Sequence, residues 1–152
     1  MSIGQNCTAE NNTINNGGSM TLGQNSTAKN NTINGKFTIN NNSKVIGNIV
    51  SEGVSLANGA NNVIVSNNQI IGDIAINKNN TNTTIASNTI TGSIEVKSSG
   101  NTISGNTITT TDNYAVSIVN TSNNTITNNT LTSSEKEGNG AVSSGTGIDN
   151  VI

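Results

Sequence analysis

The chain has 152 residues, of which 9% are charged and only 1% are aromatic, and it contains neither proline nor tryptophan. This composition cannot fill an ordinary layered core with large side chains. The formal net charge of −2, with lysine as the basic residue type, argues against nucleic-acid binding. No apolar run approaches the length that spans a bilayer.

An imperfect repeat runs through the whole chain. It is clearest where the segment 3–9 recurs as 22–28, and each copy is followed by Asn-Asn-Thr-Ile, at 11–14 and at 30–33. A sequence period of this length is typical of a solenoid.

Each unit opens with an apolar-x-apolar segment, which predicts a short strand whose two apolar side chains share one face. These segments are Met1–Ile3, Met20–Leu22, Phe37–Ile39, Val54–Leu56, Ile74–Ile76, Ile94–Val96, Val116–Ile118 and then Val142. Their spacing of 17 to 26 residues predicts about seven rungs.

Further strands are expected inside the units. A second strand is centred on Ile14, Ile33, Ile64, Ile85, Ile103 and Ile126. Later units add a third, centred on Ile70, Ile90, Ile108 and Leu131, and the third unit has a compressed version in Val45-Ile46 and Ile49. Three short strands per turn are typical of a parallel β-helix. We therefore predict an all-β solenoid with a thin core of stacked aliphatic side chains and no capping helix.

Residues 1–152 are predicted to form a single β-solenoid domain, because no linker or charge block divides them. The polar, glycine-bearing stretch 132–140 is predicted to be a loop inserted in one rung. Such insertions often lie on a binding face, and a tolerated surface excursion is an equally good interpretation.

Asparagine recurs at the corners before the inward-facing aliphatic residues. Asn tolerates left-handed backbone and also stacks into ladders, so we predict two structural Asn ladders. The first consists of Asn12, Asn31, Asn62, Asn101, Asn124 and Asn150, and the second of Asn68, Asn88, Asn106 and Asn129.

Residues suited to catalysis are scarce. The chain has no His and no Arg, so acid/base chemistry would fall to its eight carboxylates. Repeat register brings only Asp73 and Glu95 together, about 8 Å apart, a separation found in inverting glycosidase pairs. Lys97 shares their face, however, and favours a solvated charge cluster instead. We predict no enzyme activity, no cofactor and no metal site.

Cys7 is the only cysteine, so no internal disulfide can form. We interpret it as a small corner residue or as a thiol placed where two rods meet. Several Asn-x-Ser/Thr triplets occur, among them those that begin at Asn6, Asn25, Asn41 and Asn82, which would suit a glycosylated surface protein, although so much Asn and Thr produces such triplets by chance.

A small grid of threonines is predicted on the third strands. It consists of Thr89, Thr91, Thr107, Thr109, Thr130 and Thr132. The grid resembles the ice-binding face of β-helical antifreeze proteins, which implies binding to a flat surface. The ordinary β-propensity of Thr is the alternative explanation.

Both ends of the chain lie inside the repeat, because Met1–Ile3 is already a strand and 149–152 matches the second strand at 61–64. Uncapped ends favour head-to-tail stacking of copies, although a piece cut from a longer array would have the same ends. The residues predicted at this joint are Met1, Ile3, Cys7, Val142, Ile148, Val151 and Ile152.

The pattern Asn-Thr-Ile-x-x-Asn-x-Ile at 101–108 resembles the repeats of the pectin-lyase-like superfamily, especially the adhesin-like surface proteins of methanogenic archaea. This resemblance implies a right-handed β-helix at a cell surface. The Arg, His and clustered Asp of the superfamily's polysaccharide-cleaving members have no match here, so their activity is not implied.

The predicted function is therefore a non-enzymatic structural protein, extracellular or at the cell surface. Its main predicted partner is itself, in a head-to-tail filament or an adhesin stalk, with no nucleic acid and no membrane span. The alternative is a binding module that recognises a glycan or ice with a flat Thr-rich face.

Overall fold

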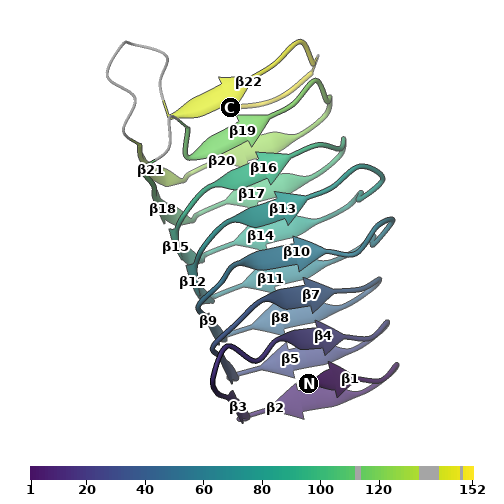
Figure 1. Ribbon diagram of the computed structural model, residues 1–152. Helices are drawn as coiled ribbons and strands as arrows, with labels where there is room; N and C mark the ends of the chain where they lie inside the picture. The colour runs from purple at the N-terminus through teal and green to yellow at the C-terminus, as the bar shows by residue number, and fades with distance from the viewer. Residues whose placement is uncertain (112–113, 134–140, 148) are drawn as a thin grey trace.

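The computed structural model describes residues 1–111, 114–133, 141–147 and 149–152, with the backbone alone at Ser144. Throughout these residues the chain forms short β-strands and no helix, coiled into a rod (Figure 1). The predicted all-β solenoid is confirmed.

The strands form three parallel sheets, and each strand pairs with the equivalent strand one turn later. Sheet A contains β1 (Ser2–Ile3), β4 (Met20–Leu22), β7 (Phe37–Ile39), β10 (Val54–Leu56), β13 (Ile74–Ile76), β16 (Ile94–Val96), β19 (Val116–Ile118) and β22 (Val142–Ser144). Sheet B contains β2 (Thr8–Glu10), β5 (Thr27–Lys29), β8 (Lys44–Ile46), β11 (Ile64–Ser66), β14 (Thr84–Ala86), β17 (Thr102–Ser104) and β20 (Thr125–Thr127). Sheet C contains β3 (Thr13–Ile14), β6 (Thr32–Ile33), β9 (Ile49–Val50), β12 (Gln69–Ile71), β15 (Thr89–Thr91), β18 (Thr107–Thr109) and β21 (Thr130–Thr132).

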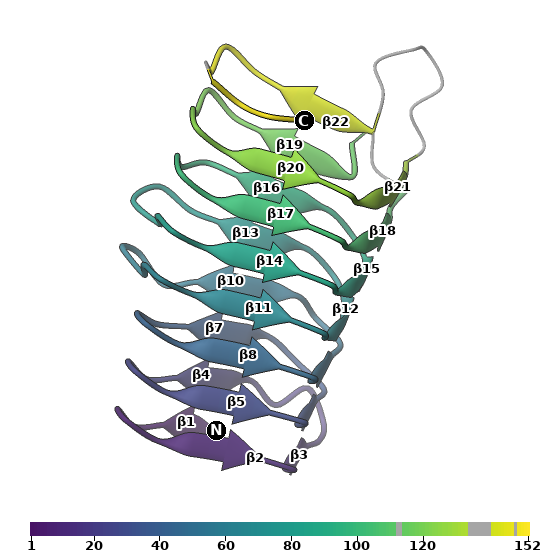
Figure 2. The ribbon, with the colours of Figure 1, turned by 180° about the vertical axis from the view of Figure 1, so that it is seen from behind.

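The coil is right-handed. With the N-terminal turn at the bottom, sheet A lies in front and runs to the right in Figure 1, while sheet B lies behind it. Figure 2 shows sheet B from its own side, again running to the right. A chain that rises while it turns in this sense forms a right-handed helix.

Sheet A follows the predicted apolar-x-apolar pattern closely. In β7 both Phe37 and Ile39 are buried, whereas Thr38 between them faces outward. Register places Phe37 on Met20 in one direction and on Val54 in the other. The same residue position therefore stacks on itself from turn to turn and forms one aliphatic column of the core.

The assignment of second strands was wrong in the first two turns. Ile14 and Ile33 belong to sheet C, where they pair with each other. Sheet B is built there around Ala9 and Ala28, which are buried and in register. Alanine has low β-propensity and no branched side chain, so its strands carry no strong sequence signal.

Two smaller differences concern which residue faces inward. In β11 the buried residue is Val65, not Ile64, which is 36% exposed. The compressed third unit forms two strands, β8 with Val45 inward and β9 with Val50 inward. In a run of consecutive aliphatic residues the sequence does not show which side chains face inward, because every member is a candidate for the core.

The last turn is shifted by one residue from the predicted match. Val151 bridges to Thr125 of β20, so it takes the position of Ile64 and not that of Val63. In the predicted loop at 132–140, Thr132 ends β21, and residues 134–140 lie outside the described residues.

Candidate functional site

The two sharp corners, from sheet A to B and from B to C, use the same two-residue arrangement. The first residue has positive φ, and the second directs its side chain toward the interior. At the B–C corner the first residue is Asn11, Asn30, Gly47, Asn67, Ser87, Gly105 or Asn128, in chain order. Asn and Gly are the residues that most readily adopt this conformation. The expectation that one Asn both bends the chain and forms the ladder was therefore wrong, because consecutive residues divide the two roles.

The second residues of the B–C corner form one continuous ladder. In chain order they are Asn12, Asn31, Asn48, Asn68, Asn88, Asn106 and Asn129, and each Nδ2 donates to the Oδ1 of the next at 2.9–3.0 Å. Asn12 and Asn31 therefore belong with Asn68 and not with Asn62. Asn48 was missed because it lies between Gly47 and Ile49, outside the Asn-Thr-Ile pattern.

Each interior rung of this ladder satisfies backbone as well as side-chain groups. The Nδ2 of Asn88 donates to the Val65 carbonyl at 2.9 Å and to Asn106 Oδ1 at 3.0 Å. Its Oδ1 accepts from the backbone N–H and from Nδ2 of Asn68, both at 2.9 Å. Asn88 is 2% exposed, so these bonds replace water that cannot reach the corner.

The equivalent row at the A–B corner is chemically mixed. In chain order it consists of Cys7, Ser26, Ser43, Val63, Thr83, Asn101, Asn124 and Asn150, each directly after a residue with positive φ. Asn101 and Asn124 donate to the Oδ1 of the next Asn, as predicted. Asn62, predicted in this row, is the exposed bend residue instead, and its Nδ2 donates to Asn42 Oδ1 at 2.9 Å.

The change of residue type in this row leaves one buried hydroxyl without a hydrogen-bond partner. Thr83 is 1% exposed, and its Oγ1 is the one buried side-chain oxygen or nitrogen of the described residues that has no hydrogen-bond partner. The residue one turn below is Val63, whose side chain can neither donate nor accept. The hydrogen-bonded row is therefore interrupted between the Ser section and the Asn section.

Of the predicted joint residues, those that the structure describes lie at the two end faces of the rod. Met1 is 51% exposed, and Val151 and Ile152 are 56% and 62% exposed. Ile3 and Val142 are partly buried and pack against the core. Ile148 lies outside the described residues.

Cys7 is exposed in the N-terminal turn. Its backbone N–H donates to Ser26 Oγ at 3.1 Å, and its thiol donates to the Gln5 carbonyl at 3.2 Å. It therefore takes the small-residue corner position that Ser26 and Ser43 fill in the next turns.

The predicted threonine grid is in register on sheet C. Thr89, Thr107 and Thr130 are aligned in one column, and Thr91, Thr109 and Thr132 in a second. All six side chains are exposed, while Ile90 and Ile108 beneath them are buried. In the other strands of this sheet the outward residues are Thr13, Thr32, Ile49, Gln69 and Ile71, so no outward side chain of a described sheet C strand is charged.

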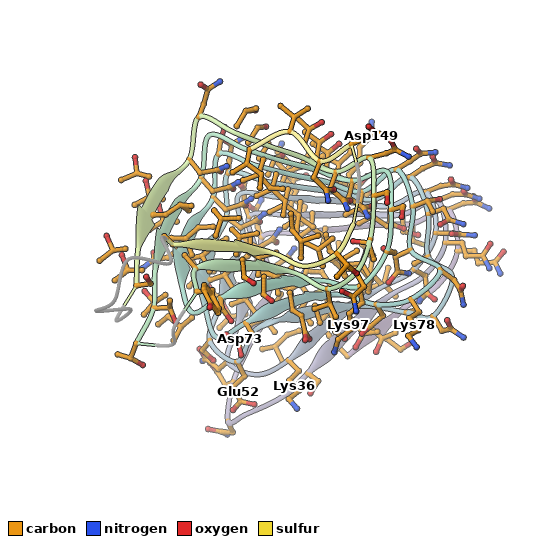
Figure 3. All side chains as sticks on the ribbon, turned by 90° about the horizontal axis from the view of Figure 1, so that it is seen from above. Lys36, Glu52, Asp73, Lys78, Lys97 and Asp149 are labelled. Atoms are coloured by element: carbon orange, nitrogen blue, oxygen red, sulfur yellow. The ribbon has the colours of Figure 1, made fainter. Side chains whose placement is uncertain are left out.

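Charged side chains gather on the other sides of the rod. Figure 3 places Lys36, Glu52 and Asp73 together along the sheet A side. A shallow groove of about 650 Å³ lies there, and Asp73, Glu95 and Tyr114 contribute to its lining.

The carboxylates of this groove already have partners. Glu95 Oε2 lies 2.6 Å from Lys97 Nζ. Asp73 Oδ1 accepts from the backbone N–H of Ser93 at 2.8 Å and from its hydroxyl at 3.0 Å. The predicted charge cluster is therefore explained by the ion pair of Glu95 and by the hydrogen bonds that Asp73 accepts at a corner. Among the described residues, no group of three or more His, Cys, Asp or Glu side chains could hold a metal ion.

The four glycosylation triplets named above lie in the turns between sheets A and B. Asn6, Asn25 and Asn82 are exposed bend residues, and Asn41 is partly exposed. Where the chain is described, no helix is long and apolar enough to cross a membrane.

Comparison with known proteins gives no relative. No family model matches the chain, and neither a curated protein nor a solved structure is significantly similar to it.

Proposed function

We propose that the protein is a structural rod, a β-solenoid whose end faces add further rungs by strand addition. In one form, copies stack end to end into an extracellular filament. In the other, the rod is a segment of a surface adhesin stalk. The next rung has the same chemistry in both forms, whether it belongs to the same chain or to a second copy.

The observation that carries this proposal is the state of the two end faces. The strands β1, β2 and β3 lie at one end of their sheets, and β22 lies at the other end of sheet A. Such strand edges recruit further strands. Met1 and Ile152 are exposed at these end faces, although the large aliphatic side chains at the equivalent positions of interior turns are buried. Covering them would continue the core columns.

Energetics favour growth by whole rungs. In a solenoid each turn contacts only its neighbours, so a new turn gains the same interface as an existing one. Covering a large aliphatic side chain contributes roughly 1.5–3 kcal/mol, and several such side chains meet at each joint. An extracellular location is supported by the exposed Asn6, Asn25 and Asn82 triplets.

Electron microscopy of the purified protein tests the assembly. We expect unbranched rods whose length increases with protein concentration, in multiples of one copy. Rods that keep the length of a single copy at high concentration would remove the filament. A matched sample in mild denaturant shows whether growth needs folded ends.

A second candidate function is binding of an ordered, uncharged surface, ice or a packed glycan, by sheet C. It is favoured by the exposed Thr columns, whose repeat of about 4.8 Å is fixed by the strand spacing. A rigid, uncharged grid of side chains can match a periodic surface, and binding does not have to remove tightly held water from charged side chains.

The variant Thr107→Lys tests this second function. A charged side chain in the centre of the grid is expected to abolish ice shaping or retention on an immobilised glycan. Thr102→Lys is the matched control, because Thr102 faces outward from β17 on sheet B of the same turn. Equal binding by the two variants and the unchanged protein would eliminate the grid.

A further inference from the structure

We infer that the rod has a clasp at the A–B corner between its fourth and fifth turns, which opens locally while the B–C ladder stays closed. The fourth turn consists of β10, β11 and β12, and the fifth of β13, β14 and β15. The clasp is the pair of connections 57–62 and 77–82, which join sheets A and B in these turns and curl beyond β10 and β13 in Figure 1. It lies in the middle of the rod, so its opening depends on neither end of the chain and on neither function proposed above.

A backbone hydrogen bond is replaced where the chain leaves sheet A. At the next step along the rod, the Lys97 N–H donates to the Ile76 carbonyl at 2.9 Å and continues the sheet. At the clasp the Asn77 N–H donates instead to Asn80 Oδ1, and Asn77 Nδ2 takes its place on the Leu56 carbonyl, at 3.0 Å. β10 and β13 are accordingly paired at two positions, whereas β7–β10 and β13–β16 are each paired at three. The pairing of sheet A therefore ends one residue early at this step.

Two polar groups lack partners where the chain enters sheet B. Val63 and Thr83 are the inward residues there, and both are buried. At the next step, the backbone N–H of the lower inward residue donates to the side chain of the upper one, since Thr83 donates to Asn101 Oδ1 at 3.0 Å. Within the described residues the Val63 N–H has no such acceptor, and Thr83 Oγ1 has no partner. A buried donor and a buried acceptor thus remain unpaired, one turn apart.

Side-chain amides hold the clasp closed. Asn80 is fully buried, and its Nδ2 donates to the carbonyls of Ala57 and Ala60 one turn below, at 2.8 and 3.0 Å. Asn61 Oδ1 accepts from the Thr81 N–H at 2.7 Å. Bonds made by side chains can open by rotation about χ angles, without displacing the backbone of the neighbouring sheets. The connections can therefore separate while the strands on either side stay paired.

Opening costs less at this step than elsewhere, because it lets water reach the two groups that are unpaired when the clasp is closed. A buried polar group without a partner carries a desolvation penalty, and hydration relieves it. At the B–C corner of the same two turns the Asn68 N–H already donates to Asn88 Oδ1 at 2.9 Å, so opening there would only break bonds. The ladder is therefore the hinge about which the first four turns tilt relative to the later turns.

Hydrogen exchange resolved by residue with NMR tests the clasp on matched amides. The Thr84 N–H donates to the Val63 carbonyl at 2.8 Å, and the Thr89 N–H donates to the Asn68 carbonyl at 2.9 Å, so each crosses the same step at a different corner. After correction for intrinsic rates, Thr84 is expected to exchange at least about tenfold faster than Thr89. Equal protection of these two amides would overturn the clasp.

The next step along the rod supplies an internal reference. Thr102 donates to the Thr83 carbonyl and Thr107 to the Asn88 carbonyl, both at 2.9 Å, so they form the equivalent pair of amides. The Thr83 N–H has its acceptor at this step. The exchange rates of Thr102 and Thr107 are therefore expected to agree within roughly threefold. A difference as large as that between Thr84 and Thr89 would make opening a property of the whole A–B corner and would overturn a clasp at one step.

The double variant Val63→Asn/Thr83→Asn is designed to close the clasp. Each introduced Oδ1 would accept from the N–H one turn below, as Asn101 and Asn124 do in the unchanged row. The amide of residue 84 is expected to slow to within roughly threefold of that of residue 89. The control is Ile64→Asn/Thr84→Asn, which places the same side chains on the outward face and is expected to leave the difference as it is. A difference that persists in the first variant would overturn the role of the unpaired groups.

Two single variants keep the test decisive if the double variant does not fold. Thr83→Val removes the unpaired hydroxyl at nearly constant volume, so it is expected to slow the exchange of Thr84 without lowering the urea midpoint. A lower midpoint would show that the hydroxyl has a partner and would overturn the clasp. Asn80→Asp keeps the acceptor for Asn77 but loses both donors, and is expected to speed exchange of Thr84 at least about tenfold while Thr89 stays unchanged. Equal acceleration of both amides would mean that the two corners open together, with no hinge.

Discussion

Replacing Asn88 with alanine is expected to lower the free energy of unfolding by about 3–6 kcal/mol. The substitution leaves the backbone N–H of Asn68 without its acceptor and removes one acceptor of the Asn68 Nδ2. It also removes a donor to the Val65 carbonyl and one of the two donors to Asn106 Oδ1. These groups lie in a corner that water does not reach, so water cannot replace the lost bonds. Urea denaturation followed by circular dichroism measures the loss.

The neighbouring residue provides the control. Thr89 faces outward from β15 and is exposed, so Thr89→Ala is expected to change stability by no more than about 1 kcal/mol. Asn12→Ala is a second comparison, because the Oδ1 of Asn12 serves no described donor and fewer bonds are lost there. A loss for Asn88→Ala that is no greater than that for Thr89→Ala would show that the ladder contributes little.

The architecture could be predicted from sequence because each turn repeats a strong local pattern. In Asn106-Thr107-Ile108-Thr109, alternation assigns Ile108 to the interior and both Thr to the surface, as observed. Stacking then follows without knowledge of distant contacts, since the partner of a residue is its counterpart one turn away. This property also made the Thr grid predictable to the residue.

The errors have a common physical origin. Ala9 and Ala28 are the buried residues of sheet B in the first two turns, and an alanine strand has no apolar contrast with its neighbours. Asn62 was wrongly assigned to a ladder and Asn48 was not assigned to one, and a bend Asn and a ladder Asn are the same residue type. Only backbone conformation separates them, a positive φ of 55° at Asn62 and a buried side chain at Asn48.

The end faces were predictable only in part. The alignment of 149–152 with 61–64 was one residue out, because Asn62 occupies the bend position of its corner whereas Asn150 occupies the inward position. The direction of the ladder is absent from the sequence altogether, since an amide has both a donor and an acceptor. Only the bonds made by the neighbouring backbone, such as the Asn12 N–H donating to Asn31 Oδ1, fix the direction of the ladder.

Replacing Phe37 with alanine is expected to lower the free energy of unfolding by about 3–5 kcal/mol, and the loss of stability is expected to differ along the rod. Phe37 is fully buried and is among the largest side chains of the core, stacked between Met20 and Val54. A cavity there weakens the contact between the first two turns and the rest of the rod. In a solenoid this contact is the main support of the terminal turns.

Hydrogen exchange measured by mass spectrometry shows which part of the rod loses stability. In Phe37→Ala, amides of residues 1–34 are expected to lose protection, while those of β14 to β18 remain protected as in the unchanged protein. Thr38→Ala, on the outward face of the same strand, is expected to leave both regions unchanged. Equal loss of protection along the entire chain would mean that the rod unfolds as one unit. A terminal segment that opens separately would instead couple stability to assembly, because the N-terminal turns carry one of the two end faces on which the proposed stacking depends.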